Sequence, residues 1–499
     1  MMKSARKWAV AFSMAATLVT AGSTSAAWAA RTDIVLGVRL EPPHLDPTAG
    51  AAAAIDEITY ANIFEGLTRI DEHGAIKPAL AESWTISADG LTYDFKLHEG
   101  VKFHDGTDFD AEDVVFSLDR ARGEDSVNAQ KALFEPIDSV VAKDKYTVEM
   151  TLKRPTGAML FNLGWGDAAM VAPESAETNK TNPVGTGPFK LEKWVKGDSI
   201  TLIRNDAYWG QPAKLEKATF KIVADAAASL AALMAGDVDA FPIFPAPEML
   251  PQFENDPRFK VVIGTTEGET ILATNNGVKP FDDVRVRKAL AYAINRQSLI
   301  DGAMFGYGTL IGSHFAPHNP AYLDLSHVYD YNPEKAKELL KEAGLEDGFK
   351  ARLFLPPTDY ARRSGLIIAS DLKKVGIELE LINVEWAQWL SNVFKGKDYD
   401  LTIISHTEPL DIGIYARDDY YFNYKNEEFK AIIAKLNATA DEAERTELLH
   451  QAQKKLNDDA VNGFLFQLAK TGVWNAKIKG LWANAPIQAN DLTAVEWMD

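Results

Sequence analysis

The sequence predicts an α/β protein of two lobes, with one additional α+β subdomain and a cleft between the lobes. Helix and strand patterns alternate at about 200–243 and again at 349–405, as in sheets covered by helices on both faces. Residues of about 68–181 instead group strands around one helix, which is typical of an α+β unit. The 499 residues, 46% of them hydrophobic, are enough for two to three domains with large cores.

Residues 1–29 have the pattern of a cleavable secretory signal. Three basic residues at 3–7 precede an apolar run from 8 to about 21, and Ala27-Trp28-Ala29 offers the small residues that a signal peptidase reads. The alternative is a membrane anchor, but this run of about 14 residues is shorter than the roughly 20 needed to span a bilayer. An exported protein has no ATP supply, which argues against kinases, synthetases and nicotinamide enzymes.

Charge and cysteine content narrow the partners and the location. The net charge is −19 for the whole chain and −22 without the signal (49 basic against 71 acidic residues), which argues against nucleic acid and anionic lipid as partners. The chain has no cysteine, so disulfides, thiolate metal sites, Cys nucleophiles and a lipid-modified Cys are excluded. We expect a monomer free in the periplasm of a Gram-negative bacterium, without stable membrane insertion.

Within residues 68–181, alternating apolar residues predict half-buried strands at about 91–103 and 146–152. Asp110 predicts the start of a helix, and Asp113 follows three residues later. The carboxylates of such a pair can accept hydrogen bonds from the free N–H groups at the start of a helix. This segment is therefore expected to fold as a compact inserted unit.

After the turn-rich segment 182–188, strands are expected near 200–204 and 219–223. Asp225 predicts the start of the next helix, and Gly236 predicts its end because glycine readily adopts the left-handed conformation found there. The next strand is expected at 238–243, which completes an α/β lobe.

The second lobe is predicted by start and stop signals for helices between strands. One helix is expected from Asp282 or Asp283 through Arg296, and another begins at Asn332, with Pro333 at its first position and Gly344 as its end. The elements that follow are a strand at 349–355, a helix at 360–375, a strand at 377–381, a helix at 386–395 and a strand at 399–405. We expect the three strands to pair in parallel.

This predicted sheet indicates where a ligand would bind. Ligands of open α/β sheets lie outside the carboxyl ends of the strands, and the loop there reads His406-Thr407-Glu408-Pro409-Leu410-Asp411. A buried carboxylate needs a cation or hydrogen-bond donors, and a ligand ammonium would supply them to Glu408 or Asp411. Pairing with a protein cation such as Arg417 is the alternative.

Aromatic residues crowd the same region. Trp386 and Tyr415 flank the loop, and both combine a large apolar face with one polar group, which suits a pocket for varied side chains. Packing in the core is the alternative role for such residues. We take Trp386 and Tyr415 as the first candidates for the wall of a binding pocket.

Motifs of catalysis are absent from the sequence. It contains no Gly-x-Ser-x-Gly, no His-Glu-x-x-His and no phosphate-binding glycine motif. His314 and His318 have the spacing of two metal ligands on one helical face, but Pro317 and Pro320 break the helix that this spacing requires. We expect an ordinary loop there, and no catalytic residue, metal or cofactor.

Ordered motifs occur along the chain. They are Leu45-Asp46-Pro47, 62–67 (NIFEGL), 80–84 (LAESW), 100–107 (GVKFHDGT) with 111–114 (AEDV), 185–189 (GTGPF), 204–209 (RNDAYW) and 283–290 (DVRVRKAL). Together these motifs resemble one family, the solute-binding proteins of peptide and nickel ABC importers, that is, extracellular solute-binding family 5. The match runs from about residue 33 to about 470.

The resemblance implies a type II periplasmic binding protein with the extra subdomain and no enzymatic activity. Lobe I would comprise 30–67, 182–272 and 471–499, the inserted subdomain 68–181, and lobe II 273–470. The ligand would be a peptide or a related small organic solute, held between the lobes and delivered to an inner-membrane permease with its ATPase. A receptor for a nickel chelate or another non-peptide solute is the alternative, and an exported hydrolase is a distant one.

The resemblance also implies a role for the loop after residue 405. In peptide-binding relatives an aspartate there accepts the α-ammonium of the peptide. Here either Glu408 or Asp411 would take that role, and His406 stands where relatives often have Trp. Trp386 matches an aromatic residue that lines the pocket of relatives. The expected ligand-binding residues are therefore Glu408, Asp411, His406, Trp386, Tyr415 and Arg417.

Overall fold

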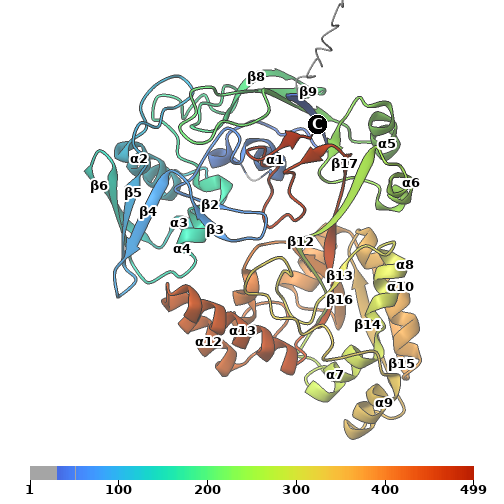
Figure 1. Cartoon of the computed structure of the whole chain (residues 1–499). Coiled ribbons are helices and arrows are strands. Elements are labelled where there is room, and N and C mark those ends of the chain that lie inside the picture. Colours follow the sequence, from blue (N-terminus) through green and yellow to red (C-terminus); the bar gives the residue numbers. More distant parts are fainter. Residues whose placement is uncertain (1–30, 51, 499) are drawn as a thin grey trace, which may run out of the picture.

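A computed structural model describes residues 31–50 and 52–498, so the expected signal at 1–29 lies outside the described residues. The chain forms two lobes that share one 11-stranded sheet (Figure 1). The strand order is β15-β14-β16-β12-β17-β11-β1-β10-β9-β8, with β13 paired to β17. The prediction of a two-lobed α/β protein is confirmed.

Lobe I contains the amino-terminal strand and the strands near it in the sheet. Its elements are β1 (Asp33–Val38), α1 (Ala53–Thr59), β8 (Phe189–Val195), β9 (Ser199–Arg204), β10 (Lys217–Ile222), α5 (Ala226–Ala235), β11 (Ala240–Phe241), α6 (Pro251–Glu254), β18 (Ile478–Lys479) and β19 (Glu496–Trp497). The predicted ends of α5 are confirmed: Asp225 accepts from the N–H of Ala228, and Gly236 has φ +78°.

The inserted subdomain has its own sheet and its own core. Its elements are β2 (Thr68–Ile70), β3 (Ile76–Pro78), β4 (Ala81–Ile86), β5 (Thr92–Leu97), α2 (Ala111–Arg122), α3 (Lys131–Phe134), β6 (Ile137–Asp144), β7 (Thr147–Leu152) and α4 (Met159–Asn162). Strands β4, β5, β7 and β6 pair in that order, and α2 buries Val114 and Leu118 in this core. Asp110 and Asp113 form the predicted capping box at the start of α2.

Lobe II is built on the parallel part of the large sheet. Its elements are α7 (Val284–Ala293), α8 (Arg296–Ala303), β13 (Thr309–Leu310), α9 (Pro333–Glu342), β14 (Phe349–Leu355), α10 (Asp359–Lys373), β15 (Ile377–Asn383), α11 (Trp386–Gln388), the π-helix η4 (Trp389–Lys395), β16 (Leu401–His406), the 3-10 helix η5 (Asp411–Ala416), α12 (Glu427–Ala438) and α13 (Glu442–Asp458). Strand β14 pairs in parallel with β15 and β16, as predicted.

One helix prediction in lobe II is wrong in extent. The helix expected to run through Arg296 ends at Ala293, and α8 begins at Arg296. The side chain of Asn295 accepts from the N–H of Ser298 and so caps α8. The sequence pattern missed this break because Asn295 follows a regular apolar stripe; an asparagine there favours a new helix start over continuation.

Two long strands connect the lobes. The 16-residue strand β12 (Phe259–Thr274) and β17 (Gly463–Asn475) pair antiparallel from lobe I into lobe II (Figure 1). Their register is interrupted between Thr265 and Glu269, so an irregular segment lies in the middle of the crossing. The boundaries expected at residues 272 and 470 fall inside these strands. The lobes are therefore connected by a hydrogen-bonded pair of strands and not by a linker.

Lobe II contacts the rest of the molecule at places besides the crossing strands. The N–H of Gly157, in the inserted subdomain, donates to the carbonyl oxygen of Asn437 in lobe II (3.2 Å). Leu410 of lobe II packs against a cluster that lobe I and the inserted subdomain share, with Tyr60 and Ala61 from lobe I and Phe161 from the subdomain. Leu410 therefore marks the place where the two lobes meet near the candidate loop.

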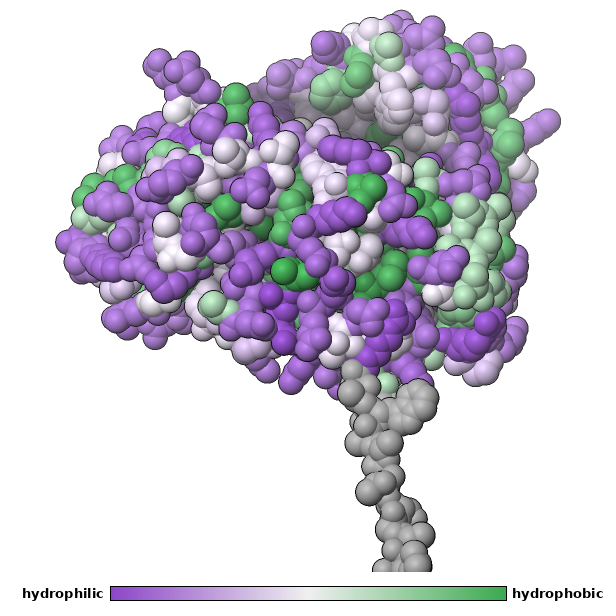
Figure 2. Space-filling view, turned by 90° about the horizontal axis from the view of Figure 1, so that it is seen from above, coloured by the Kyte–Doolittle hydropathy of each residue, from purple (hydrophilic) through white to green (hydrophobic). Residues whose placement is uncertain are grey.

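One face of the molecule is predominantly polar. Hydrophilic residues dominate the face shown in Figure 2, and apolar residues are scattered among them. None of the helices in 31–50 and 52–498 has both the length and the apolar character needed to cross a membrane.

Candidate ligand-binding site

The carboxyl ends of β14, β15 and β16 lie at one edge of the parallel sheet, at Leu355, Asn383 and His406. After His406 the chain leaves the sheet and turns at Leu410, which has φ +57°. The turn places Asp411 as the first residue of η5. The loop predicted to carry the site is therefore at the edge where ligands of such sheets bind.

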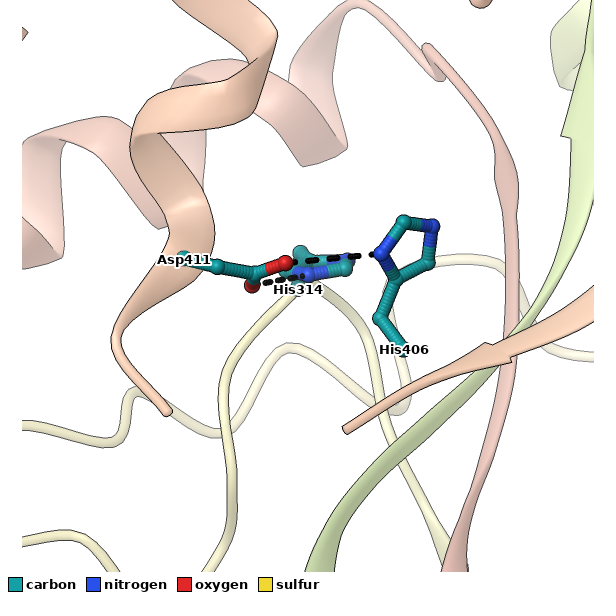
Figure 3. A group of neighbouring side chains, drawn as sticks. All are labelled: His314, His406 and Asp411. Carbon is teal, nitrogen blue, oxygen red and sulfur yellow. Dashed lines mark hydrogen bonds and ion pairs between the residues drawn. The ribbon is translucent and has the colours of Figure 1, made fainter. Parts of the chain in front are cut away.

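Asp411 is the centre of a buried polar cluster (Figure 3). Its Oδ1 lies 2.6 Å from Nε2 of His314, and its Oδ2 lies 3.4 Å from Nδ1 of His406. The second nitrogen of each imidazole contacts a tyrosine hydroxyl, at 3.2 Å for His314 with Tyr415 and 3.1 Å for His406 with Tyr421. Two Tyr-His pairs thus converge on one carboxylate.

The hydrogen bonds around His314 indicate which of its ring nitrogens carries the proton. The amide of Asn462 donates to the hydroxyl oxygen of Tyr415 (2.9 Å), which leaves that hydroxyl free to donate to Nδ1 of His314. Nε2 of His314 then carries the proton and donates to Asp411. Burial would raise the pKa of Asp411, but the two imidazoles outweigh it and hold the pKa well below its usual range. Asp411 is therefore an oriented anion.

Two further carboxylates reach the same place from β12. Glu267 and Glu269 line a small pocket together with His314, Phe315, Ala316, Asn319, Leu410 and Asp411. Oε1 of Glu267 lies 2.7 Å from Nε2 of His318, whose Nδ1 lies 2.7 Å from the hydroxyl of Thr265. Burial raises the pKa of Glu267, and the contact with His318 opposes that rise.

Glu269 differs from the other two acids because it has no cation beside it. Its side chain is buried, with 3% of its surface exposed, and its Oε2 has no hydrogen-bond partner among the described residues. Burial, with the negative charges of Glu267 and Asp411, raises the pKa of Glu269 well above its usual value. Within the described chain, the ion pairs of these three carboxylates involve histidines only.

The cluster has the donor types of a transition-metal site, but its contacts are those of hydrogen bonds. The ligand atoms of His314, His406 and Asp411 lie within 4.8 Å of one another, and two imidazoles with a carboxylate can bind such an ion. However, both imidazoles already lie between a tyrosine hydroxyl and Asp411. The three groups therefore satisfy one another without a metal.

The structure brings together three of the six predicted site residues. His406, Asp411 and Tyr415 belong to the buried cluster. Glu408 is exposed, and its carboxylate accepts from the N–H of Thr407 (3.2 Å). Trp386 is 43% exposed and packs edge-on against Trp389, with 5.8 Å between the ring centroids.

Two expectations about charge pairing need correction. Pairing of the loop carboxylates with Arg417 is the alternative to a ligand ammonium, but Arg417 is exposed and lies over the ring of Tyr420, and Asp411 pairs with histidines instead. His314 and His318 do lie in a loop, as the prolines predicted, yet this loop is not an ordinary one. Both histidines are buried, and each contacts a carboxylate. Imidazole can pack among apolar residues at lower desolvation cost than guanidinium because it can stay neutral.

Residues that the sequence did not reveal include Glu267 and Glu269. Two acids separated by one residue just before the apolar run at 271–273 are a signal, because same-face positions of a buried strand are rarely charged. Arg362 is another such residue. It is in the first turn of α10, beside the same sheet edge, and its buried Nε has no acceptor among the described residues.

The two lobes, the strands that cross between them and a polar pocket at their boundary define a two-lobed solute-binding protein. Comparison with known proteins gives its family. The model of the bacterial extracellular solute-binding proteins, family 5 (middle), matches residues 75–427. This chain therefore belongs to family 5 of the bacterial extracellular solute-binding proteins, and it is the substrate-binding component of an ABC importer.

Individual relatives agree with this assignment. The glutathione-binding protein GsiB of Pectobacterium atrosepticum is 32% identical over 503 residues, which covers 96% of each chain. The dipeptide-binding protein of Escherichia coli is 32% identical over 435 residues, covering 77% of this chain and 79% of the relative. The structure of HbpA2 from Haemophilus parasuis matches with a TM-score of 0.87 at 24% identity, covering 94% of this chain and all of that one. Members of the family are binding proteins rather than enzymes.

Proposed function

We propose that this chain binds peptides, or a related small organic solute, between its lobes in the periplasm. It then delivers the solute to an inner-membrane permease with its ATPase. The similarity to a dipeptide-binding and a glutathione-binding protein supports this class of ligand. The export pattern at 1–29 and the absence of cysteine support a receptor free in the periplasm.

The observation that carries this proposal is the oriented carboxylate of Asp411. Two imidazole groups hold it ionised at the carboxyl edge of the sheet, and a carboxylate has lone pairs for further donors. Asp411 is thus ready to accept an ammonium group of the ligand. Glu408 is the second candidate for this contact, from its exposed position on the same loop.

Other residues, four of them predicted and Arg362 not, have supporting roles in this proposal. His406 orients Asp411, and Tyr415 orients His314, which in turn contacts Asp411. Trp386 offers an exposed aromatic face for an apolar side chain of the ligand. Arg362, with its unsatisfied Nε, suits a carboxylate at the other end of a peptide, while Arg417 stays at the exposed rim.

The acidic pocket argues against the alternative of an anionic metal chelate. Glu267, Glu269 and Asp411 would repel such a ligand, and the described residues place no Lys or Arg in an ion pair with any of the three. A ligand with a positive group at this point fits the charge of the pocket better.

The test is isothermal titration with di- to pentapeptides on the wild type, Asp411→Asn and Glu408→Gln. Loss of a charge-assisted hydrogen bond costs roughly 1.5 to 3 kcal/mol, so we expect affinity to fall about tenfold or more for the variant that contacts the ammonium. Glu378→Gln is the matched control, because Glu378 forms an exposed pair with Lys350 on the surface. Unchanged affinity in both test variants would sink the ammonium assignment.

A further inference from the structure

Some buried acids elsewhere in this protein have partners for both oxygens, whereas Asp46, Asp56 and Asp167 each keep one oxygen without a hydrogen-bond partner among the described residues. Glu65, for example, accepts hydrogen bonds from the side chains of Thr186, Tyr208 and Trp209 at 2.7 to 2.9 Å. Asp239 is buried beside Arg31, at 2.6 Å. Glu269 is buried to a similar degree, without such partners for its Oε2. Its pairing is therefore incomplete in the protein alone.

Either protonation state of Glu269 leaves a group unsatisfied. An ionised carboxylate without a cation is costly to bury. A neutral carboxyl group gains an O–H donor, and no described residue accepts a hydrogen bond from Oε2 of Glu269. A positively charged group with N–H donors would satisfy Glu269 and also offset the excess negative charge of the pocket.

We propose that Glu269 accepts a cationic group of the transported solute, an ammonium or a guanidinium, in the pocket that it shares with Glu267 and Asp411. The proposal rests on the proposed solute-binding function and narrows it to solutes with a basic nitrogen. Asp411 is held by two imidazoles, whereas Oε2 of Glu269 has no partner among the described residues, so a cationic group of the solute would meet no competing partner there.

The position of the pocket couples this contact to the boundary between the lobes. Glu269 is on the crossing strand β12, and it is paired in register with His406 at the end of β16. Leu410 lines the pocket from one side and packs against lobe I from the other. The cationic group therefore enters before the lobes close, and Leu410 then covers it.

The experiment compares trialanine with N-acetyl-trialanine, which lacks the ammonium, by isothermal titration in EDTA-containing buffer. We expect the wild type to bind trialanine at least tenfold more tightly than the acetylated peptide. Glu269→Gln, which keeps the shape of the side chain, should show a clearly smaller preference for trialanine, and the preference that remains is the contribution of Asp411 or Glu408. Glu378→Gln should behave like the wild type, and circular dichroism checks that each variant is folded.

The outcomes separate this proposal from the broader one. If Glu269→Gln keeps the full preference for trialanine, Glu269 is not the acceptor, although peptide binding still supports the proposed function. If neither peptide binds the wild type, the peptide assignment fails. Agmatine, a non-peptide with both cationic groups, then serves as the probe in a thermal-shift assay. A stabilisation of the wild type that is lost in Glu269→Gln supports the proposal, and the absence of such a difference overturns it.

Discussion

At the scale of the residue, Glu269 links the charge of the pocket to the stability of the protein. Its folded-state pKa is raised by burial and by Glu267, Asp411 and Glu408. A carboxyl group with a raised pKa binds more protons in the folded state than in the unfolded one, so stability falls as pH rises. The loss begins near the unfolded pKa of glutamate, about 4.3, and continues up to the raised folded value.

The prediction is a difference in the pH dependence of unfolding between the wild type and Glu269→Gln, both without ligand. In the neutral variant the free energy of unfolding should not decrease with pH through this group, a decrease of up to about 1.4 kcal/mol per pH unit in the wild type. The variant should therefore become the more stable of the two as pH rises from 5 to 8. Urea denaturation at several pH values measures this, and parallel curves for the two proteins would contradict it. The titratable neighbours Glu267, Glu408, Asp411, His314, His318 and His406 are common to both proteins, so the difference reports the titration of Glu269 together with its effect on theirs.

Sequence reasoning located part of the site for a physical reason. The position of Asp411 followed from the strand pattern, because the carboxyl end of a parallel strand is a fixed place in the fold. The partners of Asp411 could not be predicted in this way. His314 comes from an irregular loop almost 100 residues earlier, and Glu269 meets His406 through strand register. Neither kind of contact leaves a local pattern in the sequence.

At the scale of the element, β12 depends on close backbone contact. A Cβ atom at Gly264 would lie 1.9 Å from the carbonyl oxygen of Ala483, and Ala485 donates its N–H to Thr265 beside it. Glycine is needed here because a neighbouring backbone, which cannot rotate away, occupies the space of a side chain. The crossing strand is thus held against the carboxy-terminal segment of lobe I.

Replacement of Gly264 by Ala should therefore destabilise the protein, by about 1 to 3 kcal/mol or more, since the strand must move to relieve the overlap. Gly413→Ala is a suitable control, because the nearest atom to its added Cβ would be Cγ2 of Ile433 at an ordinary 3.9 Å. Guanidinium denaturation of the three proteins gives the comparison. Equal midpoints for Gly264→Ala and the wild type would show that β12 tolerates the shift.

Helix ends were the most predictable elements. Asp110, Asp225 and Asn332 cap the helices that they were expected to cap, because the signal is a short-range hydrogen bond. The π-helix η4 was predicted only as an ordinary helix at 386–395. Its widened turn accompanies the packing of Trp389, whose Nε1 donates to the hydroxyl of Thr402 (3.0 Å). That partner lies on β16 and could not be inferred from the helix alone.

At the scale of the whole molecule, the pocket around Glu269 should influence how far the lobes close without ligand. Closure places Leu410 against lobe I and leaves Glu269 buried without a cation. The free-energy cost of burying this unpaired carboxylate opposes closure until a cationic solute binds. The unliganded protein should therefore populate an open form. Removing the charge should shift that balance toward the closed form.

Single-molecule energy transfer can measure this shift. The chain has no cysteine, so dyes can be attached at cysteines introduced at exposed Glu124 in the subdomain and Gln451 in lobe II. We expect Glu269→Gln to increase the closed fraction without ligand, and Glu378→Gln to leave it unchanged. Identical distributions in all three proteins would indicate that closure does not depend on this carboxylate.

The two ends of the described chain meet on lobe I. The guanidinium of Arg31 lies over the ring of Trp497, 4.5 Å from its centroid, and Nε1 of Trp497 donates to the carbonyl oxygen of Asp33 (2.8 Å). A fluorescent domain or a surface tether attached at either end would therefore hold the same lobe. Lobe II would remain free to move, so the protein could be immobilised as a sensor without restraining the motion that reports binding.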